Sequence, residues 1–189
     1  IRASRGACAV AAGSMTALAL TGILLRAPAV LAGEVILWRA DWLPALGLTA
    51  SFRLDGLGLM FAGLILGIGL LIIFYARHYL SAHDPAGRFY TFLMLFQGAM
   101  LGIVLSENIL MMAVFWEMTS LSSFLLIGYW HHLAAGRQGA RMALAVTGGG
   151  GLAMLAGFLL LGQAAGSYEL TEVLAAGDTI RQSPLYLPI

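Results

Sequence analysis

The chain has 189 residues, of which 60% are hydrophobic and only 10% are charged, and its formal net charge is +1. A soluble domain usually carries about 25% charged residues, and a disordered chain needs high charge with low hydrophobicity, so the composition excludes both classes. The near-neutral charge and the lack of a basic run argue against a nucleic-acid partner. The single cysteine, Cys8, leaves no intrachain disulfide and no cysteine metal site. We therefore expect an all-α fold, a polytopic bundle of membrane helices in a lipid bilayer.

Five apolar stretches are long enough to cross the hydrocarbon core of a bilayer, which takes about 20 helical residues. They cover about residues 6–25, 56–76, 89–105, 109–130 and 142–163. The first stretch either ends at about Leu25 or continues past Pro28 to Leu31. The polar break at 34–53 holds either a small β-hairpin or an interfacial loop. Residues 167–176 are typical of a short amphipathic helix with Ser167 as its N-cap.

The placement of the arginines predicts how these helices are oriented. Six arginines fall at helix ends that share one side of the membrane: Arg2, Arg5, Arg77, Arg88, Arg137 and Arg141. The opposite side carries four arginines together with six acidic residues: Arg26, Arg39, Arg53, Arg181, Glu34, Asp41, Glu107, Glu169, Glu172 and Asp178. Because cytoplasmic loops carry an excess of basic residues, we expect the side with six arginines to be cytoplasmic.

Glu117 is the only acidic or basic residue (Asp, Glu, Lys, Arg or His) in the fourth apolar stretch. At about 1.5 Å per residue, it lies roughly 13 Å from the outer end of a helix that is roughly 33 Å long, which places it near the midplane. A carboxylate in that position is costly and is a functional candidate by default, because it can take up and release protons. The alternative is a protonated structural glutamate that hydrogen-bonds between helices. Ser120 lies on the same helix face, where its hydroxyl either solvates the carboxylate or serves ordinary packing.

The fifth stretch contains four consecutive glycines, Gly148 to Gly151, directly after Thr147. Glycine permits close helix approach in a bilayer. This segment is therefore either a tight packing surface or, with Thr147 and Gly148, the thin wall of a water-filled cavity near Glu117.

Two further residues at helix ends are candidates for ion entry. Asp55 precedes the stretch that starts at Gly56, and it either caps that helix or collects protons or cations at the outer surface. His131 follows the stretch that contains Glu117. It either relays protons on the cytoplasmic side or anchors the helix end at the membrane interface.

Three segments resemble the antiporter-like family, which includes the large subunits of Mrp-type Na⁺/H⁺ antiporters and the proton-pumping membrane subunits of respiratory complex I. They are FRLDGLGL at 52–59, GAMLGIVL at 98–105 and FWEMTSLSSFLLIGYW at 115–130. The resemblance covers roughly Arg53 to Gln163 and is closest to the A-type subunits of the Mrp antiporters. The distal complex I subunit carries an arginine and an aspartate where this chain has Gly148 and Gly151.

The resemblance implies that residues 1–189 are the N-terminal part of an antiporter-like transmembrane domain, with further helices before Ile1 and after Ile189. Glu117 matches the essential glutamate of the family, which couples to a lysine on the second helix after it. This chain contains no lysine, so we expect that partner beyond Ile189.

The function that the resemblance implies is exchange of a monovalent cation, Na⁺ in particular, for protons in the cell membrane. Other antiporter subunits, H⁺ and Na⁺ or another monovalent cation are the implied partners, and no cofactor or metal site is expected. The alternatives are a proton-pumping subunit of an NADH:quinone oxidoreductase and a membrane scaffold that transports nothing. The sequence leaves the identity of the cation open.

Overall fold

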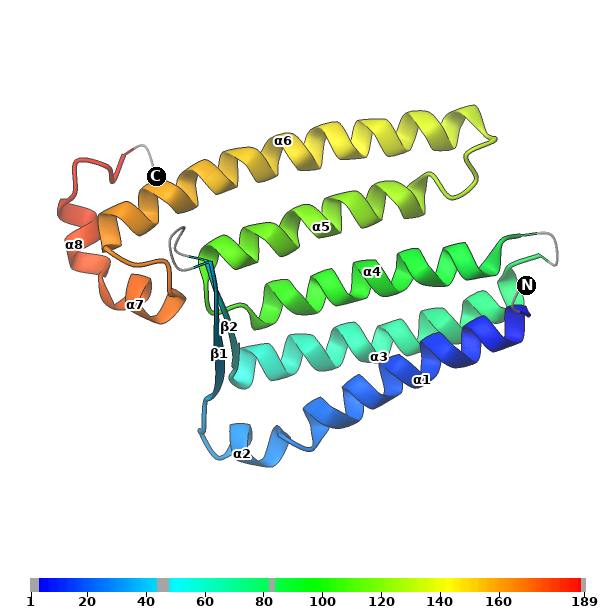
Figure 1. Ribbon diagram of the computed structural model, residues 1–189, viewed down its shortest axis with the longest axis horizontal. Helices are drawn as coiled ribbons and strands as arrows, with labels where there is room; N and C mark the ends of the chain where they lie inside the picture. The colour runs from blue at the N-terminus through cyan, green and yellow to red at the C-terminus, as the bar shows by residue number, and fades with distance from the viewer. Residues whose placement is uncertain (1–3, 44–47, 82–83, 188–189) are drawn as a thin grey trace.

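The computed structural model describes residues 4–43, 48–81 and 84–187, and its long helices lie side by side in a row (Figure 1). In chain order the elements are α1 (Arg5–Leu24), α2 (Ala27–Leu31), β1 (Ile36–Leu43), β2 (Leu48–Leu54), α3 (Gly56–Tyr79), α4 (Ala86–Leu105), α5 (Ile109–Ile127), α6 (Ala134–Ala165), α7 (Leu170–Ala175) and α8 (Gly177–Gln182). Within the described residues, five segments are long and apolar enough to cross a membrane: α1 with α2, α3, α4, α5 and α6. The expected multi-pass helix bundle is confirmed.

The connections between the long helices gather at two ends of the row (Figure 1). One end, which we call the arginine end, holds the N-terminus and the α3–α4 and α5–α6 connections. It carries Arg5, Arg77, Arg88, Arg137 and Arg141, while Arg2 lies outside the described residues. The other end, the hairpin end, holds β1, β2, α7 and α8. Successive connections therefore lie at alternate ends of the row. The prediction that the side with six arginines is cytoplasmic assumes this alternation.

The polar break between α2 and α3 is a hairpin, the first of the two alternatives that the sequence left open. Strands β1 and β2 pair antiparallel, with Ile36 opposite Leu54 and Trp38 opposite Phe52. The Trp38 and Phe52 rings lie 5.8 Å apart, within the range of favourable aromatic pairs. The first apolar stretch also takes its longer form, because α2 continues it with Pro28 in its first turn, where the missing N–H of proline has no partner to lose.

Several helix ends differ from the hydropathy-based expectation. Helix α6 begins at Ala134, eight residues before the expected 142, because alanine and glutamine extend the helix beyond the apolar run that hydropathy detects. Helix α5 ends at Ile127 rather than 130, with Gly128 as its C-cap. The N-cap assignment for Ser167 was wrong: Glu169 occupies the N-cap position of α7 without a side-chain capping bond, and Ser167 accepts a hydrogen bond from the Glu169 backbone N–H at 3.1 Å. Helix α8 was not expected.

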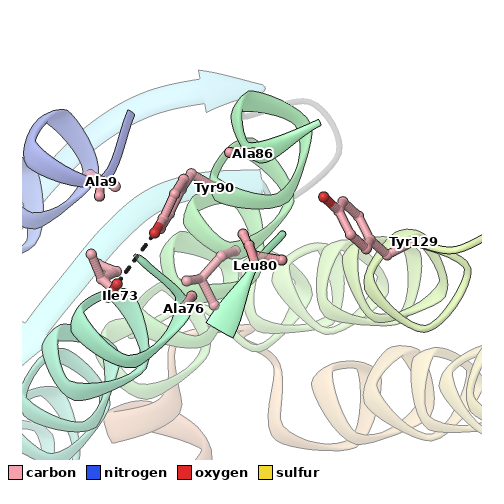
Figure 2. Packing of buried hydrophobic residues seen from close by; sticks show 9 residues of the cluster. Ala9, Ile73, Ala76, Leu80, Ala86, Tyr90 and Tyr129 are labelled. Atoms are coloured by element: carbon pink, nitrogen blue, oxygen red, sulfur yellow. Dashed lines mark hydrogen bonds between the residues drawn. The ribbon is translucent and has the colours of Figure 1, made fainter. Parts of the chain in front are cut away.

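Small and aromatic side chains pack α1, α3, α4 and the end of α5 together at the arginine end (Figure 2). Ala9 and Ala76 let the backbones of α1 and α3 approach closely. The Tyr90 hydroxyl of α4 donates to the Ile73 carbonyl of α3 at 3.3 Å. These contacts fix the arginine end of α5, and therefore the helix that carries Glu117, against its neighbours.

Candidate functional site

Glu117 sits in the middle of α5, which packs between α4 and α6. Its Oε1 atom is buried and has no hydrogen-bond partner among the described residues. The carboxyl group lies against the backbone of α6 at Gly151: a Cβ atom at that position would overlap Oε1 and would lie 2.9 Å from Cδ. Only glycine at 151 leaves room for the carboxyl group in this position.

The face of α6 that meets α5 is a stripe of small residues. Its buried residues are Ala140 and Gly151, spaced by 11 residues, which is close to three helical turns, whereas the third buried residue of α6, Gly162, lies against Tyr168. Ala140 packs against Gly128 at the C-terminal end of α5. A Cβ atom added at Gly128 would lie 3.5 Å from the Cβ atom of Ala140. These two residues allow the two helices to pack closely between Ala140 and Gly151.

The structure does not place Thr147 and Gly148 in contact with Glu117, and a water-filled cavity beside these two residues stays a prediction. Thr147 is exposed and its hydroxyl donates to the Ala143 carbonyl of its own helix at 2.8 Å. Among the described residues, no heavy atom lies within 4 Å of the Cβ position at Gly148. The contact moves to Gly151 because a helix turns by about 100° per residue, so only one of four successive glycines faces α5.

The hydroxyl groups of Thr119, Ser120 and Ser122 in α5 donate to carbonyls of their own helix. Ser120 is 4% exposed and donates to the Trp116 carbonyl at 3.4 Å, and Ser122 donates to the Met118 carbonyl at 2.7 Å. Ser120 is therefore buried on α5 as expected, but in this arrangement its proton points to the backbone rather than to Glu117. Its oxygen keeps a free lone pair for a water or another donor.

Charged and polar side chains from distant segments meet at the hairpin end, directly at the start of α5. The Asn108 side chain caps α5 by accepting from Leu110 and Met111 N–H at 3.0 and 3.1 Å, and it donates to Glu169 Oε1 at 3.0 Å. Glu169 Oε2 also accepts from Arg39 at 3.0 Å and from Ser51 at 2.8 Å. This cluster fixes the N-terminus of the helix that carries Glu117, and no sequence pattern had indicated it.

A second carboxylate of the same cluster is more deeply buried. The Glu107 side chain is 3% exposed, lies 3.7 Å from Arg53 Nη1, and accepts from the Thr171 N–H at 3.1 Å and from the Thr171 hydroxyl. Arg53 also pairs with Asp55, with 3.2 Å between Nε and Oδ2. Asp55 accepts from the Gly58 N–H at 2.8 Å, so the capping alternative for this residue is confirmed, and entry of an ion there stays a prediction.

His131 lies at the arginine end, opposite to Asp55. It is exposed, and its Nδ1 atom lies 3.3 Å from Arg88 Nη2. Within 4–43, 48–81 and 84–187, no three His, Cys, Asp or Glu side chains come together in a way that could hold a metal ion. Within the α5 span, Glu117 is the one carboxylate.

Comparison with known proteins agrees with the motifs. The family described as "NADH:quinone oxidoreductase/Mrp antiporter, TM" matches residues 106–187, and the family described as "NADH-Ubiquinone oxidoreductase (complex I), chain 5 N-terminus" matches residues 42–90. The first range contains Glu117 and the whole of α6.

Curated relatives are named as subunits of antiporters. A protein of Rhizobium meliloti, named as a probable K⁺/H⁺ antiporter subunit of the A/B type, is 52% identical over 185 residues, which is 96% of this chain and 18% of the relative. A Na⁺/H⁺ antiporter subunit of type A1 from Staphylococcus haemolyticus is 43% identical over 155 residues, 82% of this chain and 19% of the relative. The chain thus spans about a fifth of the length of these relatives.

Solved structures share the fold. A chain of the Mrp complex from Dietzia sp. DQ12-45-1b superposes with a TM-score of 0.81 at 31% identity, over 96% of this chain and 20% of that chain. An archaeal membrane-bound sulfane sulfur reductase, at 20% identity and a TM-score of 0.79, has the same fold. The expected resemblance to the A-type subunits of the Mrp antiporters is confirmed. The chain is a multi-pass membrane protein that belongs to the antiporter-like family shared by Mrp antiporters and NADH:quinone oxidoreductases.

Proposed function

We propose that this chain forms part of a monovalent cation/H⁺ antiporter and that Glu117 binds and releases the transported proton. The observation that carries this proposal is the buried Oε1 atom of Glu117, which has no hydrogen-bond partner within the described residues although it lies inside a membrane span. A buried charge without a partner is costly, so the group gains most from binding a proton or from a cation brought by another part of the complex.

Proton exchange at this site needs a path for water and a neighbouring positive charge. The family resemblance implies a lysine outside this chain as that charge, and its approach to Glu117 would favour loss of the proton. Ser120, with a free lone pair one turn away, is the hydroxyl of this chain that best fits a water next to the carboxylate. We propose that the chain works in the cell membrane in a complex with other antiporter subunits, because the relatives are named as antiporter subunits.

The test is cation/H⁺ exchange by the complete antiporter carrying Glu117→Gln. Vesicles with an imposed pH gradient are given K⁺ and Na⁺ in separate experiments, because the names of the two relatives differ in the cation. We expect Glu117→Gln to abolish exchange with either cation and Glu117→Asp to retain part of it. The matched control is Glu34→Gln, an exposed acid at the hairpin end.

A complex that assembles normally and exchanges ions at the wild-type rate with Glu117→Gln would reject the proposal and leave a scaffold role. A redox-driven proton pump is the second candidate, because residues 42–90 match the family described for complex I chain 5. The same vesicles separate the two: an antiporter exchanges ions on an imposed gradient alone, whereas a redox pump moves protons only when an electron donor is supplied.

A further inference from the structure

A cavity of about 370 Å³ opens between α4, α5 and α6 at the arginine end, away from Glu117. Its nine lining residues are Arg88, Phe92, Phe124, Leu125, Gly128, His131, Arg137, Ala140 and Arg141. Three of them are arginines and one is a histidine, and none of these nine, all within the described part of the chain, is acidic. The cavity is therefore strongly positive on one side and apolar on the other.

The positive charges of this cavity have no counter-charge among residues 4–43, 48–81 and 84–187. Arg88 donates to the Tyr129 carbonyl and its Nε atom is buried without a hydrogen-bond partner. Arg137 donates to the carbonyls of His131 and His132 at 2.8 and 3.2 Å. These acceptors are neutral, and the described residues form no ion pair with Arg88, Arg137 or Arg141.

The acidic residue of the neighbouring α3–α4 connection is engaged elsewhere. Asp84 accepts from Trp130 Nε1 at 3.0 Å and from the Ser81 N–H at 2.9 Å, and it does not line the cavity. Three guanidinium groups around one cavity without a carboxylate favour an anion, and guanidinium matches phosphate oxygens in geometry as well as charge.

The position of the cavity in the membrane matches the distribution of its lining. Helix α6 has 32 residues, about 48 Å at 1.5 Å per residue, whereas the hydrocarbon core is about 30 Å thick. The first turns of α6 with Arg137 and Arg141 therefore reach the headgroup level. Phe92 lies one turn further into α4 than Arg88, and Leu125 lies inside the α5 span, so the apolar wall faces the hydrocarbon.

We propose that this cavity binds an anionic phospholipid, with the phosphate on Arg88, Arg137 and Arg141 and an acyl chain along Phe92 and Leu125. Basic pockets between membrane helices bind such headgroups. A free phosphate ion would satisfy the arginines but would leave the apolar wall unused, which favours a lipid as the occupant. The proposal does not depend on the transport role of Glu117.

The experiment uses the complete antiporter complex and native mass spectrometry with two lipids of equal acyl chains, phosphatidylglycerol and phosphatidylcholine. We expect the complex to retain phosphatidylglycerol preferentially, and photoactivatable phosphatidylglycerol to label peptides that contain Phe92 or Leu125. Each arginine near an anionic headgroup is worth about a fivefold change in affinity. Arg137→Gln with Arg141→Gln is therefore expected to weaken the preference roughly 25-fold, whereas lysine at both positions retains most of it.

Arg77→Gln is the matched control, because Arg77 is exposed at the same end of the bundle and does not line the cavity. Equal retention of the two lipids, or an unchanged preference in the double glutamine variant, would overturn the proposal. Displacement of phosphatidylglycerol by millimolar inorganic phosphate would indicate a free-anion site instead, and a polypeptide segment of the complex seated in the cavity would also overturn it. If the double variant does not assemble, the lipid preference and the labelled peptides of the wild-type complex decide.

Discussion

Replacing Gly151 by alanine tests the contact between Glu117 and α6. The new Cβ would overlap Glu117 Oε1, would lie 2.9 Å from Cδ and would lie 3.2 Å from Trp116 Cδ1, whereas ordinary contacts are 3.4–4 Å. The carboxyl group must therefore move away from α6 by about 1 Å or more, and a displacement of that size at a reacting group can cost about 100-fold in rate.

The effect on stability is expected to be much smaller than the effect on transport. Overpacking costs about 1–3 kcal/mol, but the group that must move is the end of a flexible side chain, and alanine gains about 1 kcal/mol over glycine in helix propensity. We expect Gly151→Ala to assemble in normal amounts, with a net cost of at most about 2 kcal/mol. Its exchange rate should fall by tenfold or more.

The assay is cation/H⁺ exchange in vesicles, normalised to the amount of assembled complex. Gly150→Ala is the matched control, because among the described residues no heavy atom lies within 4 Å of its Cβ position. The shorter side chain of Glu117→Asp should relieve the overlap, so the double variant should be more active than the product of the two single losses. Wild-type exchange by Gly151→Ala, or equal losses at Gly150 and Gly151, would refute the proposed contact.

Three further predictions concern packing and charge outside the exchange site. Glu107→Ala leaves the Thr171 N–H and hydroxyl without their acceptor and removes one of the two carboxylates beside Arg53. It should lower the free energy of unfolding by about 1–3 kcal/mol, seen as loss of assembled complex on heating. Asp178→Ala, whose partner Arg181 is exposed, should change little, and equal melting of the two variants would contradict this. Gly102→Ala would push a Cβ into the Phe115 ring and should destabilise by about 1–3 kcal/mol, while Gly98→Ala, which meets open space among the described residues, should be neutral in the same heating assay. The hydrogen bond from Trp130 holds the pKa of the Asp84 carboxyl below its usual 3.8. This bond therefore stabilises the fold above that pH, and its contribution is lost as the pH falls through the lower folded pKa. Trp130→Phe should reduce thermal stability at pH 7 and reduce it progressively less as the pH is lowered below 3.8, and an equal reduction at every pH would argue against the bond.

The membrane spans were predictable because a bilayer imposes length and hydropathy on every helix that crosses it. The ends of α6 and α5 were not, since helix propensity and capping act outside the apolar run. The hairpin was one of two alternatives, because a polar break with tryptophans does not by itself fix strand pairing.

Glu117 was identifiable as a candidate site residue because a lone carboxylate in an apolar run is costly wherever it faces. Its contact was not assigned correctly, since four successive glycines point in four directions and the sequence alone does not say which faces α5.

The cluster at the hairpin end could not have been assembled from local patterns. Glu107 and Thr171 lie 64 residues apart, and Ser51 and Glu169 lie 118 apart. Only the fold brings these segments together, and they meet where α5 begins. The cluster therefore links the hairpin and α7 to the helix that carries Glu117.

Infrared difference spectroscopy on the assembled complex measures the protonation of Glu117 most directly. We expect a protonated carboxyl band that appears and disappears as the pH is changed, shifts in heavy water, and is missing in Glu117→Gln but present in Glu34→Gln. A spectrum in which no such band depends on Glu117, in a complex that still exchanges cations for protons, would contradict proton binding at this residue.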